Sequence, residues 1–105
     1  MKIIEIQSTF PDLESATNTL KHLISKRQIA CGNILPTQSL YTWEGKLNQE
    51  SESLVLMKTS IEMREVAIKE IKRVHPYQVP AIISWETESN DEYGRWVMES
   101  TSQLI

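Results

Sequence analysis

Apolar residues change their spacing several times along the chain, and each spacing predicts a different element. Residues 2–9 (KIIEIQST) are rich in β-branched side chains and predict a strand. The next segment repeats apolar residues every three to four positions, which predicts an amphipathic helix. Pro11 suits the first position of this helix, and Asp12 and Glu14 favour its first turn. The apolar face of the helix consists of Leu13, Ala16, Leu20, Leu23 and Ile24.

The middle of the chain reads as a long β-hairpin. Residues 29–36 predict a second strand, and residues 39–50 predict a strand, a turn near Glu44-Gly45 and a returning strand. Residues 53–59 (SLVLMKT) continue the returning strand. The two arms of the hairpin are therefore expected to be much longer than the first strand.

Two further helices and one strand are expected in the last third of the chain. Thr59 and Glu62 have the spacing of a capping box, which predicts the start of a second helix. Residues 79–86 (VPAIISWE) predict a fourth strand, and Ser89 and Glu92 repeat the capping-box spacing before a short third helix. The second helix shares a face made of Met63, Ala67, Ile71 and Val74, and the third helix carries Tyr93, Trp96 and Val97.

The resulting order is β-α-β-β-α-β-α. Its first six elements are those of the ferredoxin-like, or split βαβ, fold, an α+β architecture with two helices on one face of an antiparallel sheet. The chain has 105 residues, which is the size of one domain, so we expect residues 1–105 to form a single unit.

The length of the hairpin predicts an association between copies. Strands over residues 29–43 and 46–59 would reach about 45–50 Å, whereas the helices would cover about 20–25 Å. The distal hairpin, with Leu40, Tyr41 and Trp43, should therefore project past its own core and pack on another copy. The alternative is that Pro36 ends the strand and the hairpin folds back.

Composition narrows the expected setting. The net charge of −3 disfavours non-specific binding to nucleic acid, which requires a basic surface. Cys31 is the single cysteine, so a reducing compartment is expected. The sequence contains no apolar run long enough for a signal peptide or a membrane span, so a cytoplasmic protein without membrane contact is predicted.

Signatures of catalysis are absent from the sequence. The three glycines are too far apart for a phosphate-binding loop, and no G-x-S-x-G motif occurs. Residues 53–59 lack the aromatics of an RNA-binding sheet. The spacing of Cys31, His22 and His75 matches no common metal motif. We therefore predict a protein that is not an enzyme and does not bind nucleic acid.

Several stretches match one known family when they are taken together. They are IACGNILP (29–36), SLYTWEGKL (39–47), LMKT (56–59), VHPYQVPAII (74–83) and the Tyr93–Trp96 pair. Together they resemble the CutA family of divalent-cation tolerance proteins over nearly the whole chain. The resemblance implies a ferredoxin-like fold, a homotrimer built through long hairpins, a cytoplasmic location and a link to Cu²⁺ and other divalent cations. It also implies a likeness to trimeric PII signalling proteins, and it brings no established reaction.

The resemblance also suggests positions for a metal site. His75 matches one of the ligands proposed for Cu²⁺ or another divalent cation in some family members. Cys31 is a further candidate because a soft metal prefers a thiolate together with an imidazole. Some family members have a cysteine and a second histidine where this chain has Ser8 and Val74, so we expect weak metal binding. Prolines on both sides of Tyr77 make that segment stiff, and we favour a place for His75 at the rim of a subunit interface over metal ligation.

The remaining candidate positions belong to an interface or cleft between subunits. They are Tyr41, Trp43, Tyr77, Pro80 and Trp96. Two functions therefore remain open from the sequence. The first is a trimeric divalent-cation tolerance protein, and the second is a PII-like regulatory trimer that binds a small metabolite in clefts between subunits.

Overall fold

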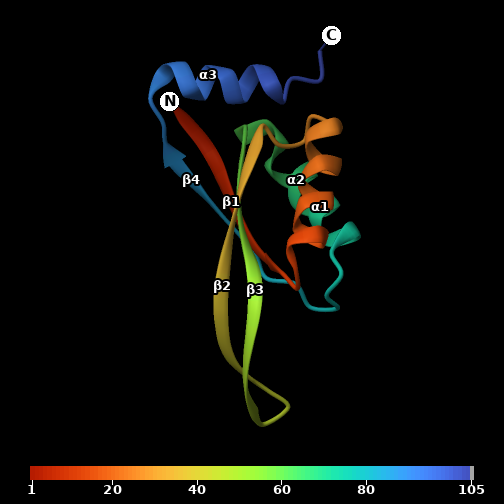
Figure 1. Cartoon of the computed structure of the whole chain (residues 1–105). Helices are drawn as coiled ribbons and strands as arrows, with labels where there is room; N and C mark the ends of the chain where they lie inside the picture. Colours follow the sequence, from red (N-terminus) through yellow and green to blue (C-terminus); the bar gives the residue numbers. More distant parts are fainter. Residues whose placement is uncertain (105) are drawn as a thin grey trace.

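The computed structural model describes residues 1–104, which form a four-stranded sheet and three α-helices (Figure 1). The strands lie in the order β2-β3-β1-β4, and every neighbouring pair is antiparallel. This arrangement confirms the predicted ferredoxin-like fold with its additional C-terminal helix. The elements are β1 (Lys2–Phe10), α1 (Leu13–Ser25), β2 (Cys31–Trp43), β3 (Lys46–Thr59), a 3₁₀ turn (Ile61–Met63), α2 (Arg64–Val74), β4 (Ile82–Glu88) and α3 (Asp91–Ser100).

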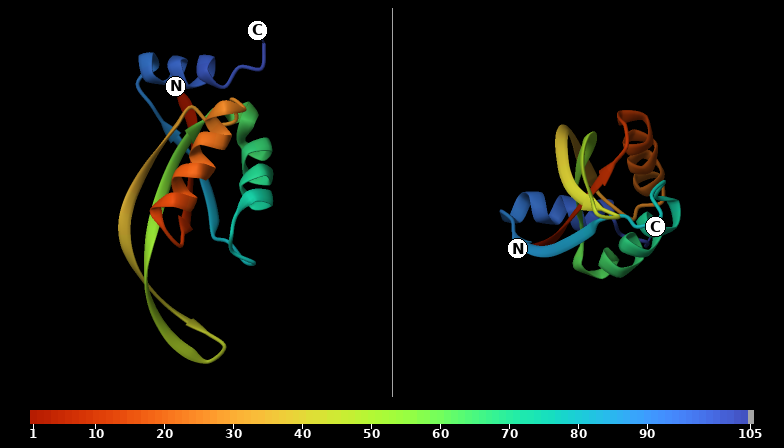
Figure 2. Two further views of the ribbon diagram at one scale, coloured as in Figure 1. Left: turned by 45° about the vertical axis from the view of Figure 1, so that its right-hand side comes forward. Right: turned by 90° about the horizontal axis from the view of Figure 1, so that it is seen from below.

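The main core lies between one face of the sheet and helices α1 and α2 (Figure 2). Alternate residues of β1 point into it, because successive side chains of a strand face opposite sides. Each large apolar side chain that is buried here contributes about 1.5–3 kcal/mol to folding. The buried members are Ile4, Ile6, Phe10, Ala16, Leu20, Leu23, Ile29, Val55, Met57, Ala67 and Ile71.

Helix α1 begins at Leu13, two residues later than the predicted start at Pro11. Asp12 is its N-cap residue, and the Asp12 carboxylate accepts a hydrogen bond of 2.7 Å from the backbone N–H of Ser15. Pro11 therefore precedes the cap and does not occupy the first helical position. The cap satisfies a backbone donor that has no partner within the helix, and this interaction fixes where the helix starts.

Neither predicted capping box is formed. The Thr59 hydroxyl donates to the backbone carbonyl of Gln28 at 2.7 Å, because Thr59 is the buried last residue of β3. A 3₁₀ turn then separates β3 from α2, so Glu62 lies ahead of the α-helix. The Ser89 hydroxyl donates to the Asn90 carbonyl, and α3 starts at the following residue. The spacing predicted that these hydroxyls would cap the helices, but each donates to a backbone carbonyl instead.

Strand β4 begins at Ile82, three residues later than the predicted start at residue 79. Its first pair with β1 joins Ile82 to Ser8. Pro80 has no N–H to donate to a neighbouring strand, and residues 75–81 instead form a connecting segment that runs across the end of the sheet.

The β2–β3 hairpin projects well beyond the helical layer, as predicted (Figure 1). β1 pairs with β3 only as far as the Phe10–Ser53 pair, whereas β2 and β3 remain paired out to Trp43–Lys46. The molecule consequently measures 47 × 24 × 20 Å. The alternative, a hairpin that folds back at Pro36, is wrong. Pro36 is accommodated because β2 is an edge strand, where a missing N–H costs no pairing on the outer side.

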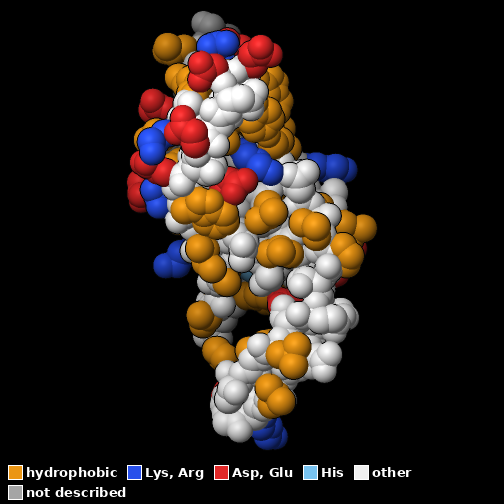
Figure 3. All heavy atoms as spheres, turned by 90° about the vertical axis from the view of Figure 1, so that its left-hand side faces the viewer, with side chains coloured by type: hydrophobic (Ala, Val, Ile, Leu, Met, Phe, Trp, Pro, Cys, Tyr) orange, Lys and Arg blue, Asp and Glu red, His pale blue; other side chains and the backbone are white. Residues whose placement is uncertain are grey.

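The second face of the sheet is covered only at one end. Helix α3 packs there through Val97 on Ile3 and Ala30, with Tyr93 at the edge of this small cluster. Beyond α3, the face presents apolar side chains to the surface, as Figure 3 shows for the side opposite α1 and α2. The most exposed of these are Leu35 at 44% and Ile83 at 53%.

The hairpin closes through a two-residue turn with an unusual backbone conformation. Glu44 has a φ of 51° and Gly45 a φ of 77° between the paired residues Trp43 and Lys46. Two successive positive φ angles are typical of a type I′ turn, whose twist matches that of the strands. Asn-Gly is the preferred sequence for this turn, so Glu44 stands at a position that suits it poorly.

We predict that Gly45→Ala lowers the free energy of unfolding by about 1–2 kcal/mol, because an L-residue with a side chain is strained at this φ. No atom lies within 4 Å of the position that a Cβ would take at Gly45, so the loss would come from the backbone alone. Glu44→Asn should raise stability by a few tenths of a kcal/mol or more. Urea unfolding at one fixed protein concentration measures both effects, and an unchanged Gly45→Ala protein would contradict the turn assignment.

Candidate functional site

An open cleft of about 360 Å³ lies between the overhanging part of the hairpin and the segment that joins α2 to β4. It brings together three of the five residues predicted for an interface or cleft, namely Tyr41, Trp43 and Tyr77. Pro80 is half-buried in the same segment but does not line the cleft. The complete lining is Thr9, Tyr41, Trp43, Glu50, Glu52, Tyr77, Gln78, Val79 and Ala81.

Strand pairing places the aromatic and acidic residues of the cleft on one face of the hairpin. Tyr41 pairs with Asn48, so it lies diagonally across from Glu50. Glu52 follows two residues after Glu50 and therefore points to the same side. Sequence reasoning missed both glutamates. The signal that could have found them is the hairpin register, which puts residues 50 and 52 on the face of Tyr41 once the turn is fixed at Glu44-Gly45.

Tyr77 joins the connecting segment to the hairpin. Its hydroxyl donates a hydrogen bond of 2.5 Å to the Glu52 carboxylate. Burial, together with this carboxylate, raises the pKa of Tyr77, and burial beside Glu50 raises the pKa of Tyr41. A tyrosine is already protonated at neutral pH, and the Tyr77 hydroxyl uses its proton as a donor toward a carboxylate.

The lining of the cleft carries negative charge only. Glu50 and Glu52 are its two ionisable acids, and no lysine or arginine is among the described residues that line it. The local potential is therefore negative and favours cationic ligands over anionic ones.

His75 is buried inside its own subunit, with 8% of its surface exposed. It ends helix α2, where its extended backbone (φ −64°, ψ 136°) is the geometry that a following proline favours. The imidazole stacks on Phe10 with the ring centres 4.3 Å apart. Its Nδ1 accepts a hydrogen bond of 3.1 Å from the backbone N–H of Tyr77. The ring thus fixes the start of the segment that carries Tyr77 into the cleft.

The other ring nitrogen of His75 is also engaged. Nε2 lies 3.1 Å from the Ser8 hydroxyl and 3.0 Å from the Thr9 carbonyl. The Ser8 hydroxyl donates its own proton to the Ala81 carbonyl, so it accepts from His75. Nε2 therefore carries the proton and Nδ1 the lone pair, which is a neutral imidazole with both nitrogens satisfied. Burial lowers the pKa of His75, consistent with this neutral form.

This environment bears on the predicted role of His75. A metal ion could bind His75 only if one of these hydrogen bonds were broken. The deep burial of His75 within its own subunit also disfavours a position at the rim of a subunit interface. Ligation of a cation by His75 stays a prediction, with the geometry of the single chain against it. The contacts instead support a positioning role.

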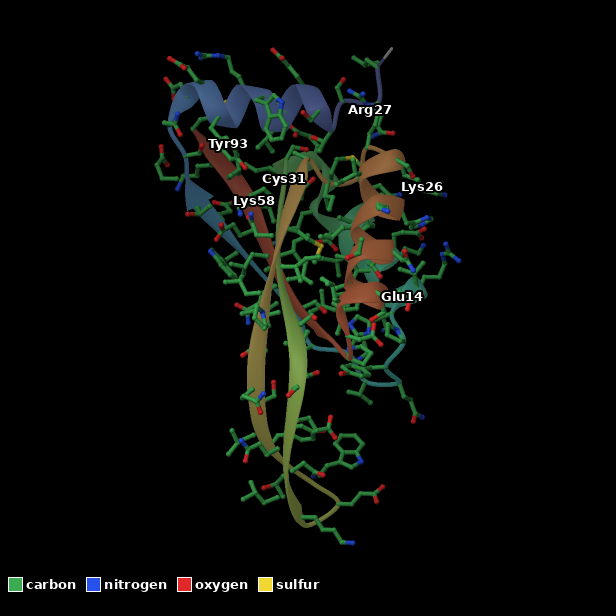
Figure 4. The ribbon with its side chains drawn as sticks, in the orientation of Figure 1. Glu14, Lys26, Arg27, Cys31, Lys58 and Tyr93 are labelled. Atoms are coloured by element: carbon green, nitrogen blue, oxygen red, sulfur yellow. The ribbon has the colours of Figure 1, made fainter. Side chains whose placement is uncertain are left out.

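Cys31 lies at the opposite end of the sheet, beside α3 (Figure 4). It is half-buried, and its Sγ lies 3.0 Å from the Tyr93 hydroxyl. Burial, together with the neighbouring thiol, raises the pKa of Tyr93 to about 12. Trp96 stacks near Tyr93 with ring centres 5.6 Å apart and is 45% exposed on α3.

The two predicted metal ligands are not brought together within one chain. Cys31 pairs with Lys58, which in turn pairs with Glu5, whereas His75 contacts β1 at Ser8 and Thr9. Among residues 1–104, no group of three or more His, Cys, Asp or Glu side chains is arranged to hold a metal ion. In the same part of the chain, no helix has the length and apolar character needed to cross a membrane.

Residues 4–100 match the model of a protein family described as CutA1 divalent ion tolerance protein. The chain is 38% identical to the divalent-cation tolerance protein CutA of Pyrococcus horikoshii over 102 residues, which is 96% of this chain and 100% of that protein. It is 36% identical to the corresponding CutA protein of Thermotoga maritima over 99 residues, 93% of this chain and 98% of that one.

Solved structures show the same similarity. Crystalline CutA1 from Pyrococcus horikoshii superposes with a TM-score of 0.92 at 39% identity and covers 95% of this chain and 99% of its own. CutA1 from Ehrlichia chaffeensis gives a TM-score of 0.92 at 32% identity, with 95% of each chain covered. A protein from Archaeoglobus fulgidus, named as a periplasmic divalent cation tolerance protein CutA, gives a TM-score of 0.90 at 33% identity, covering 97% and 100%.

We predict that His75 makes stability depend on pH below about pH 6.5, its ordinary pKa. Because the folded pKa is lowered, the unfolded chain binds more protons in this range. The contribution of the neutral ring to the free energy of unfolding is fully present above about pH 6.5. It is lost as the pH falls toward the pKa of His75 in the folded protein. The free energy of unfolding, measured with urea, should therefore fall more steeply on acidification for the unmodified protein than for His75→Gln. Equal slopes would contradict the buried neutral assignment.

Proposed function

The chain belongs to the CutA1 divalent ion tolerance protein family, and from this premise we propose that it acts in the cytoplasm as a homotrimer that binds divalent cations, including Cu²⁺, where subunits meet. The proposed role is binding without catalysis. The contact between Ser8 and His75 does not supply a nucleophile, because the Ser8 hydroxyl is buried and donates to the Ala81 carbonyl.

The observation that carries this proposal is the large apolar surface that one chain leaves uncovered. Beyond α3, one face of the sheet exposes Leu35 and Ile83, and the outer hairpin exposes Leu40, Trp43 and Leu47. An isolated two-stranded hairpin is only marginally stable in water, and exposed apolar faces of this size mark sites of association. These surfaces would be covered if they packed against further copies in a closed homo-oligomer. Three copies is the number that the family resemblance implies.

The arrangement of possible ligands supports metal binding between chains. One chain offers no cluster of three ligands among residues 1–104, so a cation could gather three only from more than one copy or from solvent. Of the two predicted ligands, Cys31 is the more accessible, because it is half-buried and has one hydrogen-bond partner, whereas His75 is 8% exposed and both its ring nitrogens are engaged. A cytoplasmic setting is supported by this free thiol, which a reducing compartment would preserve.

A second function is favoured by a different observation. The cleft has the volume of a small-molecule site and is lined by three aromatic side chains, which is the usual character of such sites. The cleft lies beside the surfaces that the homotrimer would bury, so a ligand there could report on subunit contacts. A PII-like regulatory trimer that binds a small metabolite in these clefts is therefore the second proposal.

We predict that the purified protein has a mass of three times 12.1 kDa and that Ile83→Lys dissociates it. A lysine at Ile83 would place an unpaired charge in an apolar interface, which is costly. The matched control is Val66→Lys on α2, because Val66 is 45% exposed but lies outside the sheet face. Light scattering at micromolar concentration measures the mass. A stable monomer of the unmodified protein would contradict the assembly. Dissociation by both variants would show that the effect is not specific to the sheet face.

We predict that Cu²⁺ binds no more tightly than about 1 μM, because one chain offers no preformed cluster of ligands. Cys31→Ser should weaken the binding, since thiolates are preferred ligands of soft metals, whereas His75→Gln should leave it unchanged. Calorimetric titrations with Cu²⁺ and with Zn²⁺, which has no redox chemistry, provide the measurement. Nanomolar affinity would refute the weak site, and a loss of binding in His75→Gln would restore His75 as a ligand.

A further inference from the structure

We propose that the cleft binds a short aliphatic diamine in its doubly protonated form. The two ammonium groups pair with the carboxylates of Glu50 and Glu52. The methylene chain lies against the rings of Tyr41, Trp43 and Tyr77. This inference rests on the second proposal above, that the cleft is a small-molecule site, and it gives the chemical class of the ligand.

Charge is the first reason for a dication. The two carboxylates among the cleft's described lining residues are Glu50 and Glu52, and no basic residue compensates them there. An anionic metabolite, such as a nucleotide, would enter against this potential, whereas a ligand with two positive charges would neutralise it. Aliphatic amines resemble the lysine side chain, whose pKa is about 10.4, so a diamine carries both charges at neutral pH.

The spacing of the two glutamates along the strand is the second reason. Glu50 and Glu52 lie two residues apart on one face of an extended strand, which separates their backbone positions by about 6.6 Å. A four-carbon diamine places its nitrogens at a comparable separation when it is extended. One compact metal ion, in contrast, needs ligands that converge on a point, and the described residues offer no such cluster.

The aromatic lining is the third reason. The rings of Tyr41, Trp43 and Tyr77 all line the cleft, so a ligand in it would contact aromatic faces. Faces of tryptophan and tyrosine attract ammonium groups and also pack well on methylene chains. A hydrated metal ion would gain little from these rings, whereas an alkyl diammonium ion matches both the rings and the carboxylates.

The Tyr77 hydrogen bond prepares the site before any ligand enters. It holds the Glu52 carboxylate at the wall of the cleft, and His75 holds the backbone of Tyr77 in turn. A carboxylate that is already oriented loses less conformational freedom on binding. The connection from His75 through Tyr77 to Glu52 therefore makes the buried histidine a positioning residue for this site.

Calorimetric titration with 1,4-diaminobutane, n-butylamine and 1,4-butanediol tests the proposal on the unmodified protein. These ligands carry two, one and no positive charges on the same four-carbon chain. The diamine should bind with a Kd below about 1 mM, butylamine at least about tenfold more weakly and the diol not measurably. Affinity for the diamine should fall as salt concentration rises.

Variants locate the binding. Glu50→Gln combined with Glu52→Gln should weaken diamine binding by about tenfold or more, since glutamine still accepts the Tyr77 hydrogen bond but carries no charge. The matched control is Glu62→Gln with Glu65→Gln, which removes two exposed charges near α2 and should leave the affinity unchanged. Trp43→Leu should weaken binding by about threefold or more, because it removes the π face.

Several outcomes would overturn the inference. They are equal binding of the diamine and butylamine, no diamine binding, unchanged affinity in the double cleft variant, or tight binding of ATP in the same assay. Light scattering and the Cu²⁺ titration are run on the same samples. A trimer that binds divalent metal but no diamine defeats this inference and leaves the proposed divalent-cation function standing, whereas a monomer that binds the diamine does the reverse.

Discussion

Hydrogen bonding between β2 and β3 continues for seven residue pairs, from Thr37–Glu52 to Trp43–Lys46, beyond the last pair that β1 makes with β3. This mismatch in length shapes most of the molecule. It carries Tyr41 and Trp43 out of reach of the helices, and there both rings line the cleft. It also leaves the hairpin without a neighbouring strand on either side, and the connecting segment before β4 crosses beside its base. The cleft is the space between these two parts, so the same overhang creates the exposed surface and the candidate binding site.

His75 shows how a residue can serve a site without touching a ligand. Its neutral ring bonds through both nitrogens to β1 and to the backbone of Tyr77, while its face packs on Phe10. Removing water from the ring lowers its pKa and keeps it in the form that these bonds require. Prolines restrict the segment that follows, and the ring fixes where that segment starts. The imidazole therefore holds the backbone of the connecting segment in place and does not itself contact a ligand.

The element order, the antiparallel sheet and the overhanging hairpin could be predicted from the sequence, because they follow from apolar periodicity and from strand and helix rise. The site could be predicted only in part. Aromatics stand out in a sequence, so Tyr41, Trp43 and Tyr77 were found, whereas Glu50 and Glu52 look like ordinary surface acids until the register is known. The environment of His75 was hidden for a similar reason, since Ser8 and Phe10 lie more than sixty residues away along the chain. The predicted helix starts at Pro11, Thr59 and Ser89 were wrong. The hydroxyls of Thr59 and Ser89 can bond to several groups, and contacts elsewhere in the fold determine which bond forms.

The type I′ turn at Glu44-Gly45 also bears on the order in which the molecule folds. The β2–β3 pairs are nested around this turn, from Trp43–Lys46 out to Cys31–Lys58, so the hairpin can form pair by pair outward from the turn. Hairpins form on a timescale of about 1–10 μs. Pairing of β1 with β4, in contrast, must close a loop of most of the chain and is slow by comparison. The segment that brings Tyr77 to Glu52 runs directly into β4, so we expect it to dock together with that strand. One wall of the cleft therefore exists early as a local structure, and the cleft itself is among the last features of the subunit to form.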